Sequence, residues 1–424
     1  MQLIIVEPGH FHASLIQREM YPALDRRVAV YARLGPEVLD YLNRVSLFNS
    51  RPENPTSWEL DVHLSDDPMA EIRRERPGNI AIITGRNRGK IGRILAALSA
   101  GQHVLADKPW IIDSLDIPKL EEALTLADRN HLAAYDIMTE RYEVTCQLQR
   151  EFVNDPEVFG RLERGTASEP AVTARSIHHV MKTVAGLPLR RPAWFFDVPD
   201  YGDGLADVGT HVVDLVQCTA FPDRLIDYRQ DIQVLEGRRW ALTLKAAQYL
   251  QVTGEAPPRE GDFDYFCNNS IHYTLRGVHV KMEILWNWEA PEGSGDVYEA
   301  TFRGSRARAE IRQGQAEKHI PELYIVPLDA GAAAAVSRRV DALQSRWPGL
   351  RAIESGGELR IVVPAQFRVG HEAHFAQVAK HFFQYVNSPP SMPAWERAYM
   401  LAKYAVSTGG RPTPANTSRA EGIW

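Results

Sequence analysis

The sequence contains few cysteines and no long apolar segment. Its three cysteines, Cys146, Cys218 and Cys267, lie far apart and form no CxxC pair. This usage argues against a disulfide framework or a zinc knuckle and is typical of a reducing compartment. The alanine-rich run at 330–336 is too short to cross a bilayer. The first residues lack the basic and apolar regions of a signal peptide. We therefore expect a cytoplasmic protein that does not associate with membranes.

An excess of positive charge is also missing. The formal net charge is −6, with 44% hydrophobic and 24% charged residues. These fractions are ordinary for a globular protein, and the charge gives no reason to expect nucleic acid or an anionic membrane as a partner. A chain of 424 residues is too long for one compact core, so two domains are expected.

The first third of the chain alternates short apolar runs with amphipathic segments. Unbroken apolar runs are typical of strands that are buried on both faces of a parallel sheet. Strands are predicted at 3–6, 27–32, 58–64, 79–84, 103–106 and 131–136, and helices at 13–21, 36–42, 90–100 and 115–130. This alternation predicts an α/β Rossmann domain, a doubly wound parallel sheet, over residues 1–142.

Polar and apolar residues alternate in the rest of the chain. Strands are expected at 161–166, 226–234, 271–288, 297–311, 323–327 and 359–363, and helices at 371–386 and 394–407. A period of two indicates a large open, mainly antiparallel sheet with one covered face. We predict an α+β domain over residues 143–424 that includes the C-terminal helices.

The glycine fingerprint of a dinucleotide-binding turn is largely absent. Aligning G-x-G-x-x-G with the turn Glu7-Pro-Gly-His-Phe-His12 leaves only Gly9 at a glycine position. Pro8 removes one amide donor, and Glu7 would repel a phosphate unless its carboxylate turned away. His10 and His12 could donate to phosphate oxygens or could simply pack.

The end of the second strand carries Arg33 and no acidic residue. An arginine there could face a 2′-phosphate or stack on adenine, so the sequence leaves the choice between NAD and NADP open. We expect NAD, with NADP as the alternative. The expected cofactor-binding residues are Gly9, His10, Phe11, His12, Arg33, Thr84, Arg86, Asn87, Asp107 and Lys108.

Two stretches carry residues suited to catalysis. Lys108 follows a buried strand and precedes a proline, and ligands of open α/β sheets bind beyond the carboxyl ends of the strands. The glycine-rich stretch at 201–214 contains Asp207, His211 and Asp214, whose spacing places them on one face of a helix. A histidine oriented by an acid is suited to general-base catalysis. The alternative is a capped helix with a satisfied histidine.

These two stretches resemble motifs of the Gfo/Idh/MocA family of oxidoreductases. Ala106-Asp107-Lys108-Pro109 is similar to the family's Glu-Lys-Pro motif, with aspartate in place of glutamate. The stretch at 201–214 is similar to Gly-Gly-Gly-x-x-x-Asp-x-Gly-x-His-x-x-Asp, with Asp203 in place of one glycine. The resemblance implies that Lys108 binds or polarises the reacting hydroxyl, that His211 is the acid/base, and that Asp207 binds substrate or orients these two. It assigns Asp214 a structural role and implies a homodimer or homotetramer formed through the open sheet.

A basic and aromatic cluster precedes the glycine-rich stretch. Such donors and rings suit sugars and anionic groups, and the alternative is a solvated basic loop. The residues expected to bind substrate are His178, His179, Lys182, Arg191, Trp194 and Arg141. His371 and His374 resemble a zincin pair but are one residue too close, so no metal is expected and a helix is predicted to begin there.

Three functions are compatible with these residues. The first is an NAD(P)-dependent oxidoreductase that acts on a hydroxyl of a sugar, a sugar derivative or a cyclitol. The second is a redox-neutral, NAD-dependent glycoside hydrolase, which oxidises transiently, eliminates the aglycone, adds water and returns the hydride, possibly on an anionic glycoside. The third is a non-catalytic dinucleotide sensor, which the presence of both Lys108 and His211 disfavours.

Overall fold

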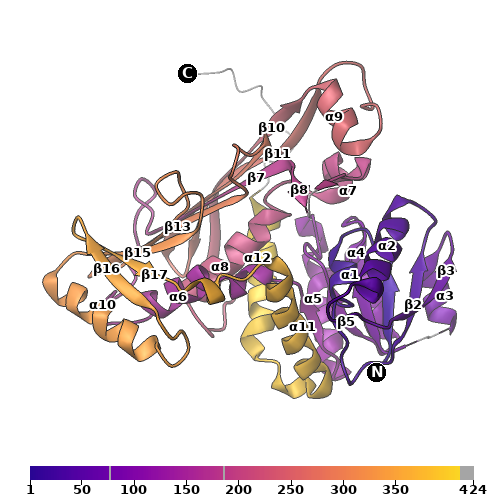
Figure 1. Cartoon of the computed structure of the whole chain (residues 1–424), viewed down its shortest axis with the longest axis horizontal. Coiled ribbons are helices and arrows are strands. Elements are labelled where there is room, and N and C mark those ends of the chain that lie inside the picture. Colours follow the sequence, from indigo (N-terminus) through magenta and orange to yellow (C-terminus); the bar gives the residue numbers. More distant parts are fainter. Residues whose placement is uncertain (76–77, 185–186, 411–424) are drawn as a thin grey trace. The chain divides into compact units, whose positions relative to one another are not determined.

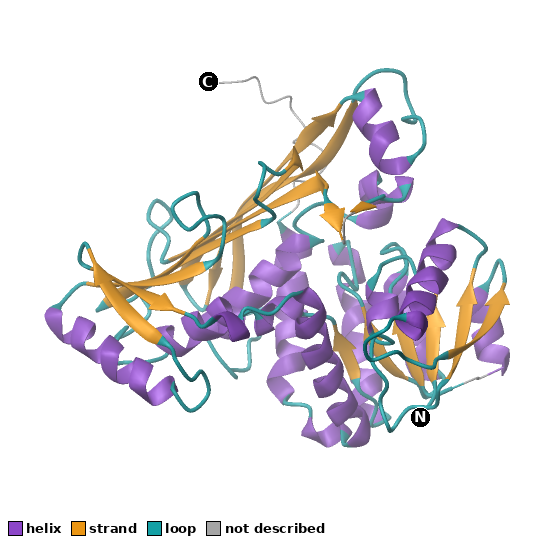
Figure 2. Ribbon diagram, viewed as in Figure 1, coloured by secondary structure: helices purple, strands orange, loops and turns teal. Residues whose placement is uncertain are grey.

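The protein divides into two compact units in the computed structural model, which describes residues 1–75, 78–184 and 187–410. The parallel-sheet unit comprises Met1–Glu143, Pro199–Tyr201 and Val369–Tyr404. The rest of the described chain forms the mixed-sheet unit. Figures 1 and 2 show the elements of both units.

A six-stranded parallel sheet forms the centre of the first unit. Its strand order is β3-β2-β1-β4-β5-β6, which reverses direction between β1 and β4 as in a doubly wound fold. All four residues of β1 and of β4 are buried, as their unbroken apolar sequences predict. The strands are β1 (Leu3–Val6), β2 (Arg27–Ala32), β3 (Glu59–Leu64), β4 (Ile80–Ile83), β5 (His103–Ala106) and β6 (Ala134–Asp136). The predicted Rossmann fold is therefore confirmed.

Helices surround this sheet (Figure 2). They are α1 (His12–Leu15), α2 (Pro36–Ser50), α3 (Pro68–Glu75), α4 (Lys90–Ser99), α5 (Ile117–Arg129), α11 (His371–Asn387) and α12 (Ala394–Gly409). The prediction of a helix over 13–21 is wrong, because α1 ends at Leu15. Beyond it, the backbone carbonyls of Gln17 and Arg18 accept hydrogen bonds from the side chains of Trp58 and Arg51 instead of from helical amides.

The C-terminal helices α11 and α12 pack in the parallel-sheet unit. The predicted boundary at 142/143 had placed them in the second domain. Phe375, Val378 and Phe382 of α11 lie in one hydrophobic core with residues of β1 and β2. Met400 and Tyr404 of α12 lie in the core on the other side of the sheet. The apolar faces of these helices are thus buried against a sheet that is distant in sequence. Residues 405–410 group with the mixed-sheet unit, and residues 411–424 lie outside the described part.

A nine-stranded sheet dominates the second unit, in the order β10-β11-β12-β7-β13-β14-β15-β17-β16. Every neighbouring pair is antiparallel except β12 and β7, so the expected mainly antiparallel sheet is confirmed. Its strands are β7 (Val172–Met181), β10 (Ile232–Leu244), β11 (Phe263–Leu275), β12 (Val278–Glu289), β13 (Val297–Arg303), β14 (Ala307–Arg312), β15 (Glu322–Pro327), β16 (Arg351–Ser355) and β17 (Glu358–Val362).

Two predictions for this sheet are wrong. Residues 161–166 form only the isolated bridges of Leu162 and Gly165. Most of the predicted strand 226–234 lies outside the sheet, because β10 begins at Ile232. The basic segment around His178, for which a solvated loop is the alternative, is the strand β7 between β12 and β13. Buried and exposed residues alternate only over its first half, and the two histidines that follow are compensated by a distant carboxylate.

Helices accompany the nine-stranded sheet, and α10 packs against β15 and β16 (Figure 1). They are α6 (Val144–Val153), α8 (Val208–Ala220), α9 (Ala246–Thr253) and α10 (Ala330–Leu343). The short helix α7 (Val198–Tyr201) falls, apart from its first residue, in the parallel-sheet unit. A two-stranded ribbon consists of β8 (Thr183–Val184) and β9 (Leu187–Pro188). Across the described residues, the helices fall short of the length and apolar character that a membrane span requires.

Candidate functional site

The turn after β1 is shaped by an ion pair. Glu7 has a left-handed backbone with φ of 44°, and its Oε2 lies 3.2 Å from Nε of Arg93. Gly85, after β4, packs against this turn, since a Cβ there would lie 2.7 Å from the carbonyl oxygen of Glu7. The carboxylate that would repel a phosphate is therefore compensated by an arginine.

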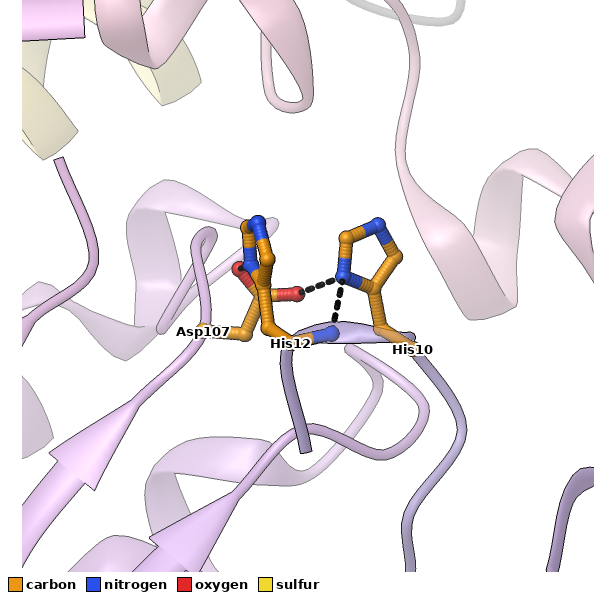
Figure 3. Close-up of side chains that lie close together, drawn as sticks. All are labelled: His10, His12 and Asp107. Carbon is orange, nitrogen blue, oxygen red and sulfur yellow. Dashed lines mark hydrogen bonds and ion pairs between the residues drawn. The ribbon is translucent and has the colours of Figure 1, made fainter. Parts of the chain in front are cut away.

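Three side chains meet at the carboxyl ends of β1 and β5. Figure 3 shows the imidazole of His10 facing the carboxylate of Asp107, with His12 beside it. Nδ1 of His10 lies 3.0 Å from Oδ2 of Asp107, and Nδ1 of His12 lies 2.9 Å from Oδ1. His12 and Asp107 are buried, while His10 is about a third exposed. Three predicted cofactor-binding residues thus form one polar cluster.

The charges of this cluster follow from its surroundings. Burial raises the pKa of Asp107, but His10, His12 and Lys90 outweigh this effect and hold the pKa well below its ordinary value. Burial lowers the pKa of His10 well below its usual range. At neutral pH, the cluster therefore holds a carboxylate beside a neutral imidazole.

Behind the cluster lies a buried lysine that the sequence did not reveal. Lys90 opens α4 and is 1% exposed. Its Nζ donates to Oδ1 of Asn87 at 2.7 Å and to the backbone oxygen of Asp107 at 3.1 Å. Asn87 in turn donates to the backbone oxygen of Tyr201 at 2.6 Å. The predicted residue Asn87 is thereby fixed in place, and these bonds tie the turn after β4 to the end of β5.

The remaining predicted residues of this unit differ in exposure. Thr84 is buried, Arg33 and Arg86 are exposed, and Lys108 is half-buried after β5, with a cis peptide bond to Pro109. Arg141 instead makes two hydrogen bonds to Glu396, at 2.9 and 2.8 Å. This contact holds α12 in the unit, and the role of Arg141 in substrate binding stays a prediction.

In the mixed-sheet unit, the glycine-rich stretch is packed tightly before α8. The amide of Gly204 donates to the backbone oxygen of Cys267 at 3.0 Å, and the amide of Leu205 donates to Oδ1 of Asn269 at 2.9 Å. The helix begins at Val208, so Asp207 is its N-cap residue and is not part of its first turn. Asp207 is buried and His211 is half-buried. Asp214 is also buried, within α8.

Predicted substrate-binding residues at the end of β7 converge on an acid that sequence reasoning missed. Asp296 precedes β13, and its carboxylate lies 3.0 Å from Nδ1 of His178 and 3.2 Å from Nδ1 of His179, and accepts from Nζ of Lys182. Burial raises the pKa of Asp296, but these three groups outweigh it and hold the pKa far below its ordinary value. Nothing in the local sequence marks a partner that is more than a hundred positions away.

The same cluster reaches toward α8. Burial lowers the pKa of His178 and of Lys182, and Asp207 is among the groups that oppose this lowering. Asp207 therefore lies within electrostatic range of both side chains. Asp207, a predicted catalytic residue, thus lies near the cluster of His178, His179 and Lys182, which are predicted to bind substrate.

Arg191 extends this cluster with an aromatic surface. Its guanidinium carbon lies 4.3 Å from the ring centroid of Phe195 and 5.2 Å from that of Trp286, which are cation–π distances. It also donates to the backbone oxygens of Val180 and His179. Trp194 lies in the adjacent 3₁₀ turn and is half-buried.

Comparison with known proteins defines the class. Residues 148–411 match the family model described as "Putative oxidoreductase C terminal domain". Because this match covers more than half of the chain, the protein belongs to this oxidoreductase family. No curated protein matches the chain.

Solved structures agree with this class. A putative oxidoreductase from Parabacteroides merdae is 39% identical, with a TM-score of 0.94 over 96% of both chains. A putative oxidoreductase from Erwinia carotovora is 14% identical, with a TM-score of 0.60 over 97% of both chains. A 3-ketoreductase from Actinomadura kijaniata, solved with NADP and TDP-benzene, is 16% identical, with a TM-score of 0.57 over 96% of this chain and 97% of that one. The last two share the fold.

Proposed function

We propose that the protein is a nicotinamide-dependent oxidoreductase of the Gfo/Idh/MocA type that acts on a hydroxyl of a sugar, a sugar derivative or a cyclitol. One observation carries the proposal. A Rossmann sheet with Lys108 at the carboxyl end of β5 is joined to the oxidoreductase-family domain, in which α8 begins beside Asp207 and carries His211.

The residues at the carboxyl edge of the parallel sheet fit a dinucleotide. Arg33 and Arg86 both act electrostatically on Arg93, the ion-pair partner of Glu7, so three guanidinium groups lie within electrostatic range at this turn. Such groups bind phosphates by paired hydrogen bonds. In a doubly wound fold the adenosine half lies beyond the end of the second strand, where Arg33 stands. The A. kijaniata 3-ketoreductase with this fold was solved with NADP, which supports a nicotinamide cofactor here.

Each catalytic residue has a separate task in this proposal. The nicotinamide would accept or return a hydride at the carbon that bears the hydroxyl. The Lys108 ammonium would bind the hydroxyl oxygen and stabilise negative charge there. His211 would take the hydroxyl proton at a ring nitrogen, because the ordinary pKa of histidine lies near neutral pH. Asp207 would orient the substrate or His211.

The cluster at the end of β7 would recognise the substrate. His178, His179, Lys182 and Arg191 supply donors, and Phe195 and Trp286 supply apolar ring surfaces in the same neighbourhood. Sugars present both hydroxyls and apolar C–H faces, so this mixture suits them. We also propose a homodimer or homotetramer through the open sheet, which is supported by the exposed apolar side chains of Leu235, Trp240 and Phe266 on β10 and β11.

A turnover assay with substitutions tests the function. Purified protein is offered sugars and cyclitols with NAD⁺ and NADP⁺, and nicotinamide absorbance is followed. We expect Lys108→Ala and His211→Ala each to reduce kcat by about 10²–10⁴-fold, as for the loss of a general acid or base. Lys119→Ala, at an exposed lysine on α5, should leave turnover unchanged.

Two results would count against the proposal. Full turnover in both Lys108→Ala and His211→Ala would remove the catalytic assignment. Release of aglycone from aryl glycosides without a lasting change in nicotinamide absorbance would replace the dehydrogenase with the redox-neutral hydrolase.

A further inference from the structure

The cluster of His10, His12 and Asp107 has the composition of a metal site. Each residue offers one ligand atom, and these atoms all lie within 4.8 Å of one another. Two imidazoles and a carboxylate are ligands that Zn²⁺ and other divalent transition metals accept. The turn that supplies both histidines stands where a dinucleotide-binding fold would place its glycines.

The spacing of the ligand atoms suits a common cation. Zinc lies about 2.0–2.2 Å from nitrogen and oxygen ligands, so adjacent ligands in a tetrahedral or octahedral shell are separated by about 2.9–3.6 Å. Nδ1 of His10 lies 3.0 Å from Oδ2 of Asp107 and Nδ1 of His12 lies 2.9 Å from Oδ1, so each histidine nitrogen is within this interval of one of the two carboxylate oxygens. The contacts are also normal hydrogen-bond lengths. The distances therefore permit either direct hydrogen bonds to Asp107 or a cation bound between the histidines and the carboxylate.

Two contacts of His10 compete for one position on its ring. Nδ1 of His10 lies 3.0 Å from Oδ2 of Asp107, where a hydrogen bond requires a proton on the nitrogen. The same Nδ1 accepts from the backbone amide of His12 at 3.4 Å, which requires a lone pair in its place. One nitrogen cannot satisfy both contacts with the same site on the ring. A cation between the nitrogen and the carboxylate would use the lone pair of Nδ1 in place of the 3.4 Å amide contact, and the close approach to Asp107 would then need no proton on that nitrogen.

The surroundings of His12 resemble the outer shell of a metal ligand. Its Nε2 lies 3.2 Å from Nε2 of His371, and the two rings stack with centroids 5.0 Å apart. Nε2 of His371 also contacts Oγ1 of Thr139 at 3.3 Å. Metal-ligating histidines usually have the second ring nitrogen fixed by such a contact, which leaves Nδ1 of His12 directed at Asp107.

We propose that His10, His12 and Asp107 bind a divalent transition-metal cation, with Zn²⁺ as its representative. Three protein ligands leave at least one coordination position for an oxygen ligand, as in catalytic zinc sites. The ion adds positive charge to a turn that has lost two of its three glycines and one amide donor. This site was not anticipated from the sequence, and it does not depend on the proposed function.

Metal titration tests the proposal directly. The full-length protein, without a histidine tag, is stripped with chelator and titrated with ZnCl₂ by calorimetry, and with CoCl₂ while the visible d–d absorbance is followed. We expect one ion per chain and a Co²⁺ band from mixed nitrogen and oxygen ligands. His10→Gln and Asp107→Asn should each weaken binding at least about 100-fold, and His371→Ala about 10–100-fold, the range for outer-shell partners.

A matched control separates this site from adventitious binding. His272 and His279 form another histidine pair, with ring nitrogens 3.0 Å apart, so H272A/H279A should bind the ion as the native protein does. Zn²⁺ should raise the melting temperature of the native protein and of H272A/H279A, while the melting temperatures of H10Q and D107N should stay unchanged. The absence of stoichiometric binding, or unchanged affinity in folded H10Q and D107N, would overturn the proposal.

Discussion

Gly204 has no room for a side chain. A Cβ at this position would lie 2.2 Å from the backbone oxygen of Cys267, and that backbone cannot move without disturbing β11. The loop before α8, which ends at Asp207, therefore depends on this glycine. The glycine-rich sequence predicted a turn, but only the packing shows that this glycine is required by a close approach.

Gly204→Ala is expected to lower the free energy of unfolding by about 1–3 kcal/mol, as overpacking does. Gly92→Ala is the control, because a Cβ there would meet nothing within 4 Å. It lies in α4, so alanine should stabilise the protein by about 0.5–1 kcal/mol. Urea unfolding checks both, and equal stability of the two variants would contradict the packing argument.

Substitution of Arg33 tests whether the protein selects NADP⁺ over NAD⁺. If it binds a 2′-phosphate, Arg33→Ala loses a charge-assisted hydrogen bond, which corresponds to about a tenfold higher Kd for NADP⁺. The Kd for NAD⁺, which lacks that phosphate, should change by less than about twofold. Fluorescence titration measures both constants, with the exposed Arg26→Ala as a control. An equal loss for both cofactors would assign Arg33 to the adenine instead.

Among the helices and strands, the predicted bounds are correct where an unbroken apolar run is buried in the parallel sheet. β1 and β2 have the predicted bounds, because continuous apolar residues can be buried only between two covered faces. β7 was missed for the opposite reason. His178, His179 and Lys182 are compensated by Asp296, a tertiary partner that no local pattern reveals.

The carboxylate of Asp296 has a pH-dependent effect on stability. The pKa of Asp296 is lower in the folded protein than its ordinary value of 3.8. Its stabilising contribution is therefore complete above that value and is lost as the pH falls through it toward the folded pKa. We expect Asp296→Asn to destabilise the protein at pH 7 by about 1–3 kcal/mol, because Lys182 and the two histidines lose their anion.

Denaturant unfolding of the native protein and D296N at pH 6 and at pH 3.5 measures this effect. The difference in unfolding free energy between the two proteins should shrink at the lower pH. At pH 3.5 Asp296 is partly protonated in the unfolded chain, so the native protein loses part of the stability that the ionised carboxylate provides. Glu299→Gln, on the adjacent strand with a longer ion pair to Arg175 of 4.0 Å, is the control. A difference that grows on acidification would contradict the predicted sign.

For the whole molecule, the sequence predicted the fold class of both halves but not which segments complete them. The two late helices were recognised from their periodicity, with α11 beginning at His371 as expected. Their assignment to the second half followed only from chain order. The catalytic candidates Lys108 and His211 were found from motifs, whereas Lys90 and Asp296 required the three-dimensional structure.

The packing of α11 leads to a further prediction. Phe382 is fully buried in the core with β1 and β2, and its neighbour Phe383 is only partly buried. Phe382→Ala should therefore lower the free energy of unfolding by about 3–5 kcal/mol, and Phe383→Ala by clearly less. Thermal unfolding followed by circular dichroism compares them, and a reversed order would mean that α11 presents a different face to the sheet.

The three-segment composition of the parallel-sheet unit also affects how the chain is made. Domains commonly fold in order as they leave the ribosome, at about 5–20 residues per second. Here the six strands emerge before the long segments of the mixed-sheet unit at 144–198 and 202–368, and α11 and α12 follow only after those segments. Synthesis of the intervening chain takes on the order of ten seconds or more at that rate. During that time both apolar sides of the nascent sheet lack part of their native cover, α11 on one side and α12 on the other, and the exposed surface is a natural binding site for chaperones.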